Sequence, residues 1–174
     1  MSISSTARKA GPYNGNGITV AFPFAFKVFS AADVLVVKTA PAAVESTLVL
    51  TTDYTVSLNA DQDSNPGGTV TVVSAPASGY KITISSQVAE LQPVVLTNAG
   101  GFYPKVINDA LDRLTILAQQ LAEKVERAVK VDISSLLTPD DFLQDLATAA
   151  VDAEASALAA AASALAAEES AASI

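Results

Sequence analysis

The sequence contains no cysteine, no histidine and no tryptophan. Without cysteine the chain has no disulfide framework, no zinc–thiolate site and no thiolate nucleophile. Without histidine it lacks the commonest general base and the commonest metal ligand. Aromatic residues are also few, with six Phe and four Tyr among 174 residues, which predicts a small core. These absences remove the most frequent forms of side-chain catalysis, and the sequence suggests no cofactor.

Positive charge is missing from the C-terminal part of the chain. Residues 1–130 hold all ten Lys and Arg and ten of the acids, whereas residues 131–174 hold the other eight acids and no base. Contact with phosphates needs clustered positive charge, so nucleic acid is not an expected partner. The N-terminus lacks the apolar segment of a signal peptide, and the uncharged stretch 155–167 is too short to span a bilayer. We therefore expect synthesis in the cytoplasm and no membrane insertion.

Residues 1–103 are predicted to form a β-rich domain. Apolar and polar residues alternate clearly along 54–58 and 81–85. Similar runs occur at 18–22, 34–38, 47–50 and 69–73, with turn residues rich in Gly, Asn and Pro between several of them. Short strands at this spacing indicate a small antiparallel sandwich or barrel. A single helical turn is expected at Ala31–Asp33.

Residues 104–131 are predicted to form a coiled-coil helix. Pro104 suits the first helical position, and acid-to-base pairs four residues apart, such as Asp109 and Arg113, support the helix. An apolar seam, with members alternately four and three residues apart, is typical of helices that wind around one another. The seam consists of Ile107, Leu111, Leu114, Ala118, Leu121, Val125 and Ala128. The alternative is a helix packed on its own β domain, with these residues simply core.

The width of the apolar face bears on the number of helices. Leu117 and Val129 extend it beyond the seam. A wide face fits three or more helices better than two, or else one flank that packs on the β domain.

A second helix is predicted after a linker at residues 132–139. Thr138 to Asp141 provide an N-cap, a proline at the first helical position and an acid at the third. Residues 140–174 form an Ala-rich stalk with a repeat every seven residues. Its weaker seam consists of Val151, Ala155, Leu158, Ala162 and Leu165, where Ala buries little area. The repeat is still running at Ile174, so we expect the stalk to be the start of a longer fibre.

One loop has the composition of a calcium site but not its pattern. Residues 59–65 are rich in Asp and Asn. An EF-hand loop needs Gly at its sixth position and Glu at its twelfth. Counted from Asp61 these positions hold Pro66 and Val72, so we expect a solvated hairpin loop and no metal site.

Two pairs of adjacent acids are no better candidates for catalysis. They are Asp140 with Asp141 and Glu168 with Glu169. Adjacent residues on a helix do not face each other, whereas general acid–base pairs need opposed carboxylates in a cleft. We predict no catalytic residues, and therefore no enzyme.

Several motifs together resemble those of a known family. The block Gly100-Gly101-Phe102-Tyr103-Pro104, followed by the Asp-Arg-Leu of residues 112–114, resembles the N-terminal virion-anchoring region of tail fibres and tailspikes from short-tailed bacteriophages. Upstream blocks agree in order: Tyr13-Asn14-Gly15-Asn16-Gly17, Phe22-Pro23-Phe24-Ala25-Phe26, Thr52-Asp53-Tyr54-Thr55-Val56 and Gly67-Gly68-Thr69-Val70-Thr71. The Ser-Ala repeats after residue 150 are similar to the stalks of such fibres.

The resemblance implies an α+β homotrimer located in the virion tail. Its β domains would dock onto a tail adaptor or portal-proximal tail protein, and its stalk would carry a distal part that binds the host receptor or cleaves polysaccharide. That distal part is not in this sequence, so the resemblance implies structural attachment for these residues. Candidate docking aromatics are Tyr13, Phe24, Phe26, Phe102 and Tyr103, each with core packing as its alternative, whereas Phe22 and Tyr54 are expected in the core.

Other functions remain open at the level of sequence. The chain could be the head of a polysaccharide-degrading tailspike whose catalytic part lies elsewhere. It could also be a sugar-binding adhesin module with the aromatics as a stacking platform, or a coiled-coil scaffold unrelated to phage.

Overall fold

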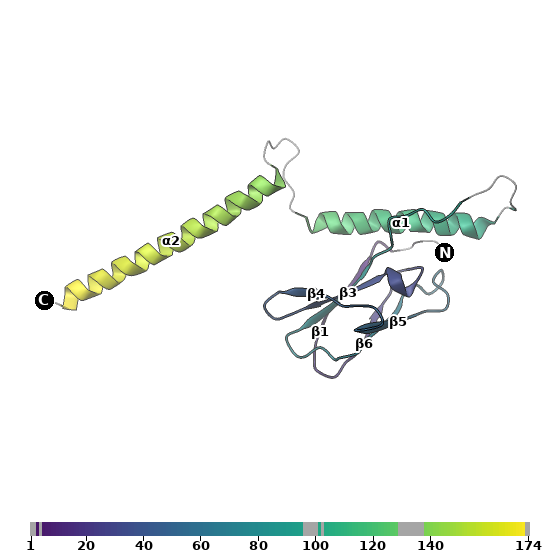
Figure 1. The fold of residues 1–174 in the computed structure, drawn as a ribbon, viewed down its shortest axis with the longest axis horizontal. Helices are drawn as coiled ribbons and strands as arrows, with labels where there is room; N and C mark the ends of the chain where they lie inside the picture. The colour runs from purple at the N-terminus through teal and green to yellow at the C-terminus, as the bar shows by residue number, and fades with distance from the viewer. Residues whose placement is uncertain (1–2, 4, 96–100, 102, 129–137, 173–174) are drawn as a thin grey trace. The chain divides into compact units, whose positions relative to one another are not determined.

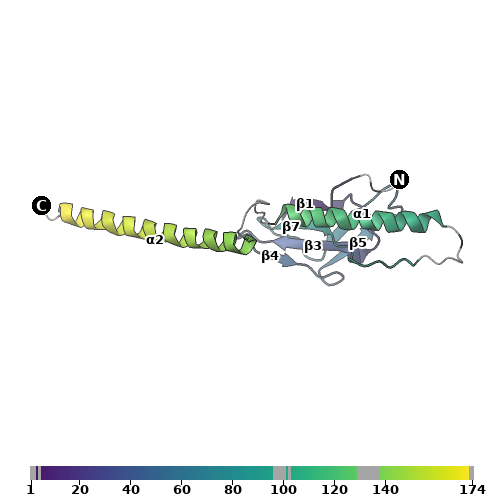
Figure 2. The same cartoon turned by 90° about the horizontal axis from the view of Figure 1, so that it is seen from above.

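The computed structural model describes residues 3, 5–95, 101, 103–128 and 138–172, with side chains of the last helix described as far as Leu165. Seven strands form two antiparallel sheets. The first sheet has the order β1-β7-β3-β4, formed by Lys9–Asn14, Lys81–Ser86, Val34–Thr39 and Glu45–Thr47. The second has the order β2-β6-β5, formed by Ala21–Phe24, Gly68–Val72 and Tyr54–Leu58. The predicted α+β class with antiparallel sheets is confirmed (Figures 1 and 2).

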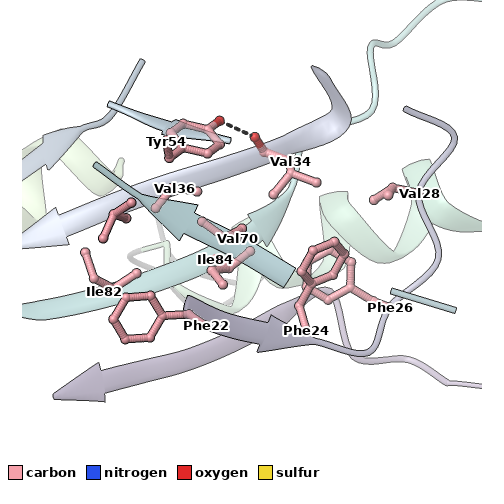
Figure 3. Packing of buried hydrophobic residues seen from close by; sticks show 11 residues of the cluster. Phe22, Phe24, Phe26, Val28, Val34, Val36, Tyr54, Val70, Ile82 and Ile84 are labelled. Atoms are coloured by element: carbon pink, nitrogen blue, oxygen red, sulfur yellow. Dashed lines mark hydrogen bonds between the residues drawn. The ribbon is translucent and has the colours of Figure 1, made fainter. Parts of the chain in front are cut away.

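The two sheets share one core, which makes the β domain a sandwich. Phe22 and Phe24 of β2 and Val70 of β6 belong to the same buried cluster as Val36 of β3 and Ile84 of β7 (Figure 3). Buried and exposed residues alternate along β2 and β7, as the period of two along a strand requires. The predicted core positions Phe22 and Tyr54 are buried, and the Tyr54 hydroxyl donates a hydrogen bond to the Val34 carbonyl at 2.6 Å.

Strand β1 is the element that the sequence pattern did not predict. It contains Gly11 and Pro12, which ordinarily mark turns. The pairing of β1 with β7 shifts register between Ala10 and Tyr13, so Gly11 and Pro12 lie in a bulge. Because β1 is an edge strand, a proline costs no hydrogen bond to a second neighbour. The other six strands match the predicted runs to within three residues at each end, and the turn at Ala31–Asp33 (η1) is present.

The predicted turn between β5 and β6 is a hairpin connection. Gly67 there has a φ of +102°, and a Cβ at this position would lie 2.0 Å from the Phe24 carbonyl oxygen. Only glycine fits such a close approach of two backbones. The interpretation of residues 59–65 as a hairpin loop is consistent with this geometry.

Helix α1 spans Pro104–Glu126, and helix α2 spans Pro139–Ala172. The chain divides into two compact units at residue 126, so α1 belongs with the β domain rather than to a separate helical segment. The expected helix limits at 131 and 174 and most of the expected linker fall outside the described residues. Ala128, the last predicted member of the seam, lies beyond the end of α1.

Candidate assembly interface on helix α1

Helix α1 is attached to the β domain by one of its faces. Its buried residues are Asp112, Ile116 and Gln120, spaced four apart and therefore on one side of the helix. Ile116 is completely buried and supplies the apolar contact. The two flanking residues are polar, so each needs a bonding partner inside the interface.

Gln120 bonds the backbone just after strand β7. Its side-chain oxygen accepts hydrogen bonds from the Ser86 hydroxyl at 2.6 Å and from the Val88 N–H at 2.8 Å. Its side-chain nitrogen donates to the Val88 carbonyl at 3.2 Å. The carboxamide thus satisfies both backbone groups of Val88 as a neighbouring strand would, and it fixes the position of α1 along the sheet.

Asp112 forms a buried ion pair with Lys27, the residue that follows the apolar run after β2. The Lys27 Nζ donates to the Asp112 carboxylate at 2.7 Å, and both side chains are buried. The same ammonium also bonds Asp63 in the β5–β6 hairpin loop. This one cation therefore joins three segments of the chain: the run after β2, the hairpin loop and α1.

The pairing shifts the ionisation of these groups. Burial acts to lower the pKa of Lys27, but the hydrogen bonds and charges of Asp112 and Asp63 outweigh it and raise the pKa above its ordinary value. The hydrogen bond from Lys27 and its positive charge lower the pKa of Asp63. Lys27 and Asp63 are consequently both charged at neutral pH.

Arg113 holds the segment that leads away from β7 against α1. Its guanidinium donates to the carbonyls of Ala89 at 2.6 Å and Leu91 at 2.8 Å. Lys124 approaches Glu90 of the same segment at 3.4 Å. Arg113 was expected to pair with Asp109, but Asp109 bonds Lys105 at 2.8 Å instead. We call residues 89–92 the connector segment.

The predicted seam lies on the opposite face of α1 and is exposed. The exposed fractions of Leu111, Leu114, Leu121 and Val125 are 54%, 59%, 62% and 46%. Ile107 is half-buried and Ala118 is exposed. In heptad terms the seam occupies positions a and d, whereas Asp112, Ile116 and Gln120 occupy b, f and c. The alternative is therefore right that α1 packs on its own β domain, but wrong that the seam residues form that core, because the contact uses the other face.

A groove runs beside the seam. Its volume is about 430 Å³, and α1 forms its floor while the connector segment forms its outer wall. The lining residues are Glu90, Leu91, Gln92, Arg113, Leu114, Leu117, Ala118 and Leu121. Seam residues thus form part of the groove, and Leu91 adds an apolar side chain that is 70% exposed.

Helix α2 begins where the sequence predicted. The Thr138 hydroxyl accepts the Asp141 N–H at 3.2 Å, and the Asp141 carboxylate accepts the Thr138 N–H at 2.9 Å. These reciprocal bonds form a capping box, and the bonds from Thr138 lower the pKa of Asp141. The seam residues of α2, including Leu158 and Leu165, are exposed.

The candidate docking aromatics separate into three groups. Phe24 and Phe26 are buried with their rings 4.9 Å apart, so they are core residues and not exposed anchors. Tyr13 is half-buried against Phe22, with its hydroxyl donating to the Pro23 carbonyl. Tyr103 is 68% exposed just before α1. Phe102 lies outside the described residues.

The acidic hairpin loop has a structural use that its sequence did not reveal. Asp61 accepts hydrogen bonds from the backbone of Asp63 and Ser64 and so closes a local turn. Asp63 then reaches Lys27. In the part of the chain that the structure describes, no group of three or more acids is placed to hold a metal ion.

The polar residues that attach α1 were missed because only the seam was read from the helix. Asp112 was considered as part of the Asp-Arg-Leu block, whereas its partner is Lys27, 85 residues earlier. A usable signal was present: Asp112, Ile116 and Gln120 recur every four residues opposite the seam. An isoleucine on the face that a coiled coil exposes to solvent indicates that something else covers it.

Comparison with known proteins bears on the origin of the chain. No protein-family profile matches the chain. The tail spike protein of Salmonella phage epsilon15 is 34% identical over 126 residues, which make up 72% of this chain but only 12% of the phage protein. Within the described residues, neither helix combines the length and the apolar character needed to cross a membrane. The chain is thus a phage tailspike-related region, and the relationship predicted from its sequence motifs is confirmed.

Proposed function

We propose that this chain attaches a phage tail fibre or tailspike to the virion tail, and that it does so as a homotrimer assembled through the seam of α1. One observation carries the proposal. The apolar a and d positions of α1 are exposed while its opposite face is held against the β domain by Gln120 and by the Lys27–Asp112 pair. The relationship to a phage tail spike protein supports a structural role in a phage tail.

The energetics favour covering the seam. Burying a leucine or valine side chain contributes about 1.5 to 3 kcal/mol relative to leaving it exposed. One face of α1 exposes four large apolar side chains: Leu111, Leu114, Leu121 and Val125. Every additional copy of the chain brings the same four side chains to be buried. Leu117 extends the face toward the connector segment, and a face of this width suits three helices better than two.

The attached β domains would lie outside the helical bundle. Because b, c and f positions point away from a coiled-coil axis, the domain that each α1 carries on those positions leaves the seam free for neighbours. Three copies then present three identical docking faces to the tail. Once one face has bound, the others act at high effective concentration, so weak individual contacts hold firmly together.

The partner that we propose is a tail adaptor or portal-proximal tail protein. Of the described candidate aromatics, Tyr103 is exposed and Tyr13 is half-buried, so these two are the proposed contributors to the docking face. Host receptor binding and polysaccharide cleavage are assigned to other parts of such a fibre. We propose no catalytic role for this chain, which lacks histidine and cysteine.

The decisive experiment is the mass of the purified chain in solution. Light scattering at micromolar concentration should give three times the chain mass of 17.7 kDa. A monomer at that concentration would remove the basis of the proposal. Immobilised trimer should then capture the tail adaptor protein of the same phage, and the monomeric variant Leu114→Asp should capture it far less because multivalency is lost.

Two assays test the competing functions. A glycan array probed with the intact chain should give no reproducible binding, since binding there would favour a sugar-binding module. Incubation with capsular or O-antigen polysaccharide should release no oligosaccharide. Product formation would place an active site within this chain and would contradict structural attachment alone.

A further inference from the structure

The groove beside the seam indicates how neighbouring copies are oriented. We propose, on the basis of the trimer proposed above, that the connector segment of one copy packs against the α1 of the next copy in a parallel bundle. Leu91 and Leu117 of one chain would cover Thr115 and Ala122 of its neighbour. The connector segment is then part of the subunit interface, and the occupant of the groove is a second copy of this chain.

The seam and the groove are continuous. Leu114, Ala118 and Leu121 belong both to the seam and to the groove. A helix that covers the seam therefore also covers the floor of the groove, and its side chains approach the outer wall at Leu91. At 70% exposed, Leu91 is poorly placed in an isolated chain, yet Arg113 holds its backbone in position through the 2.8 Å hydrogen bond.

The two flanks of α1 are also complementary in size. The flank beside the groove carries Leu117 at a g position, with Leu91 next to it. The other flank carries Thr115 and Ala122 at e positions, both small and exposed. In a parallel coiled coil the g flank of one helix meets the e flank of the next. Large residues then meet small ones, whereas an antiparallel pair would place Leu117 against Leu117 and leave the small flanks facing each other.

Cross-linking tests the contact directly, because the natural chain has no cysteine. The full chain carrying Leu91→Cys and Ala122→Cys is treated with a short bis-maleimide and run on a denaturing gel, with the mass measured separately by light scattering. Covalent trimers are expected. The matched control combines Val95→Cys with Ala122→Cys, because Val95 is 83% exposed and lies outside the groove. This control should give markedly fewer covalent trimers.

The alternative outcomes are distinct. A trimer by mass with no more cross-linking than the control overturns this inference and leaves the proposed function intact. Covalent dimers from Leu91→Cys alone mean that two connector segments meet each other, which overturns the parallel arrangement. A monomer by mass rejects the proposed function, and this inference with it.

Truncation provides a second readout. Leu91→Ser should raise the concentration at which the trimer half-dissociates by about tenfold or more, since each interface loses a buried leucine. Val95→Ser should leave that concentration unchanged. Equal behaviour of the two variants would contradict the assignment of Leu91 to the interface.

Discussion

Helices α1 and α2 have the same seven-residue spacing of apolar residues but differ on the face opposite that apolar seam. The back of α1 carries Asp112, Ile116 and Gln120, which bond or pack against the β domain. The side chains of α2 are exposed throughout its described part, from Pro139 to Leu165, and its seam alternates Ala with larger residues. Heptad spacing therefore predicts which stripe is apolar, whereas the residues opposite the stripe decide whether the helix also belongs to a domain.

The difference also sets how much each helix can contribute to assembly. The α1 seam contains three leucines that are more than half exposed in the single chain. The α2 seam relies on Ala at alternate positions and lies in a region with eight acids and no base. We therefore expect α1 to supply most of the stability of the proposed trimer and α2 to contribute less.

The largest expected effect comes from placing a charge in the α1 seam. Leu114→Asp would bury three carboxylates among leucines, at a cost of several kcal/mol for each desolvated charge, and should yield monomers in sedimentation analysis. Leu114 is 59% exposed in the single chain, so the β domain should retain its circular dichroism spectrum.

The matched variant Leu158→Asp places the same charge in the seam of α2. It should leave a trimer at micromolar concentration. Monomers from Leu158→Asp, or trimers from Leu114→Asp, would reverse the comparison between the two helices.

The next largest effect concerns the back of α1. Lys27→Met removes the ammonium that Asp112 bonds at 2.7 Å and leaves the carboxylate buried, which should cost about 3 to 5 kcal/mol in the free energy of unfolding. Combining Lys27→Met with Asp112→Leu removes both charges and should recover most of that loss. Chemical denaturation followed by circular dichroism gives both values.

Lys105→Met is the control for this pair. Lys105 bonds Asp109 on an exposed surface, and such pairs contribute about 0 to 1 kcal/mol. A loss on Lys105→Met as large as that on Lys27→Met would mean that burial of the Lys27–Asp112 pair is not what attaches α1.

The sequence predicts elements with a clear period better than it predicts their attachment. Alternation located strands such as β5 and β7 closely, and the capping pattern located the start of α2. Strand β1 was missed because its Gly and Pro resemble a turn, and only an edge position with a bulge accommodates them.

Contacts between distant segments lie beyond any local pattern. Lys27 follows an apolar run, and nothing nearby indicates that it pairs with a carboxylate 85 residues later. Likewise Phe24 and Phe26 were candidate docking residues on the sequence alone, and only the packed sheets place them in the core. The exposed seam was predictable, because a period of 3.5 residues is local to the helix.

The attachment of α1 should also depend on pH, with a smaller effect. The raised pKa of Lys27 means that its contribution is fully present below its ordinary value of 10.5 and is lost as the pH rises through the higher folded value. The lowered pKa of Asp63 means that its contribution is present above 3.8 and is lost as the pH falls through the lower folded value. Because Asp63 is partly exposed, the acid side should be the weaker one.

Melting temperatures measured across pH test this dependence. The melting temperature of the wild-type chain should be constant at intermediate pH and should fall at both the acid and the alkaline end. The variant that combines Lys27→Met with Asp112→Leu should lose the alkaline fall that Lys27 causes. An unchanged alkaline fall in that variant would assign the dependence to other groups.

The smallest expected effect is at the start of α2. Thr138→Ala removes the hydroxyl that accepts the Asp141 N–H, and the loss of an N-cap costs about 1 kcal/mol of helix stability. Thr148→Ala is the matched control, because Thr148 lies inside α2, where alanine favours the helix. Amide hydrogen exchange should therefore accelerate in the first turns of α2 for Thr138→Ala and slow or stay constant for Thr148→Ala. Since the side chains of α2 are exposed as far as Leu165, its first turns depend on this cap. Equal protection in the two variants would mean that packing between copies, rather than the cap, holds the start of α2.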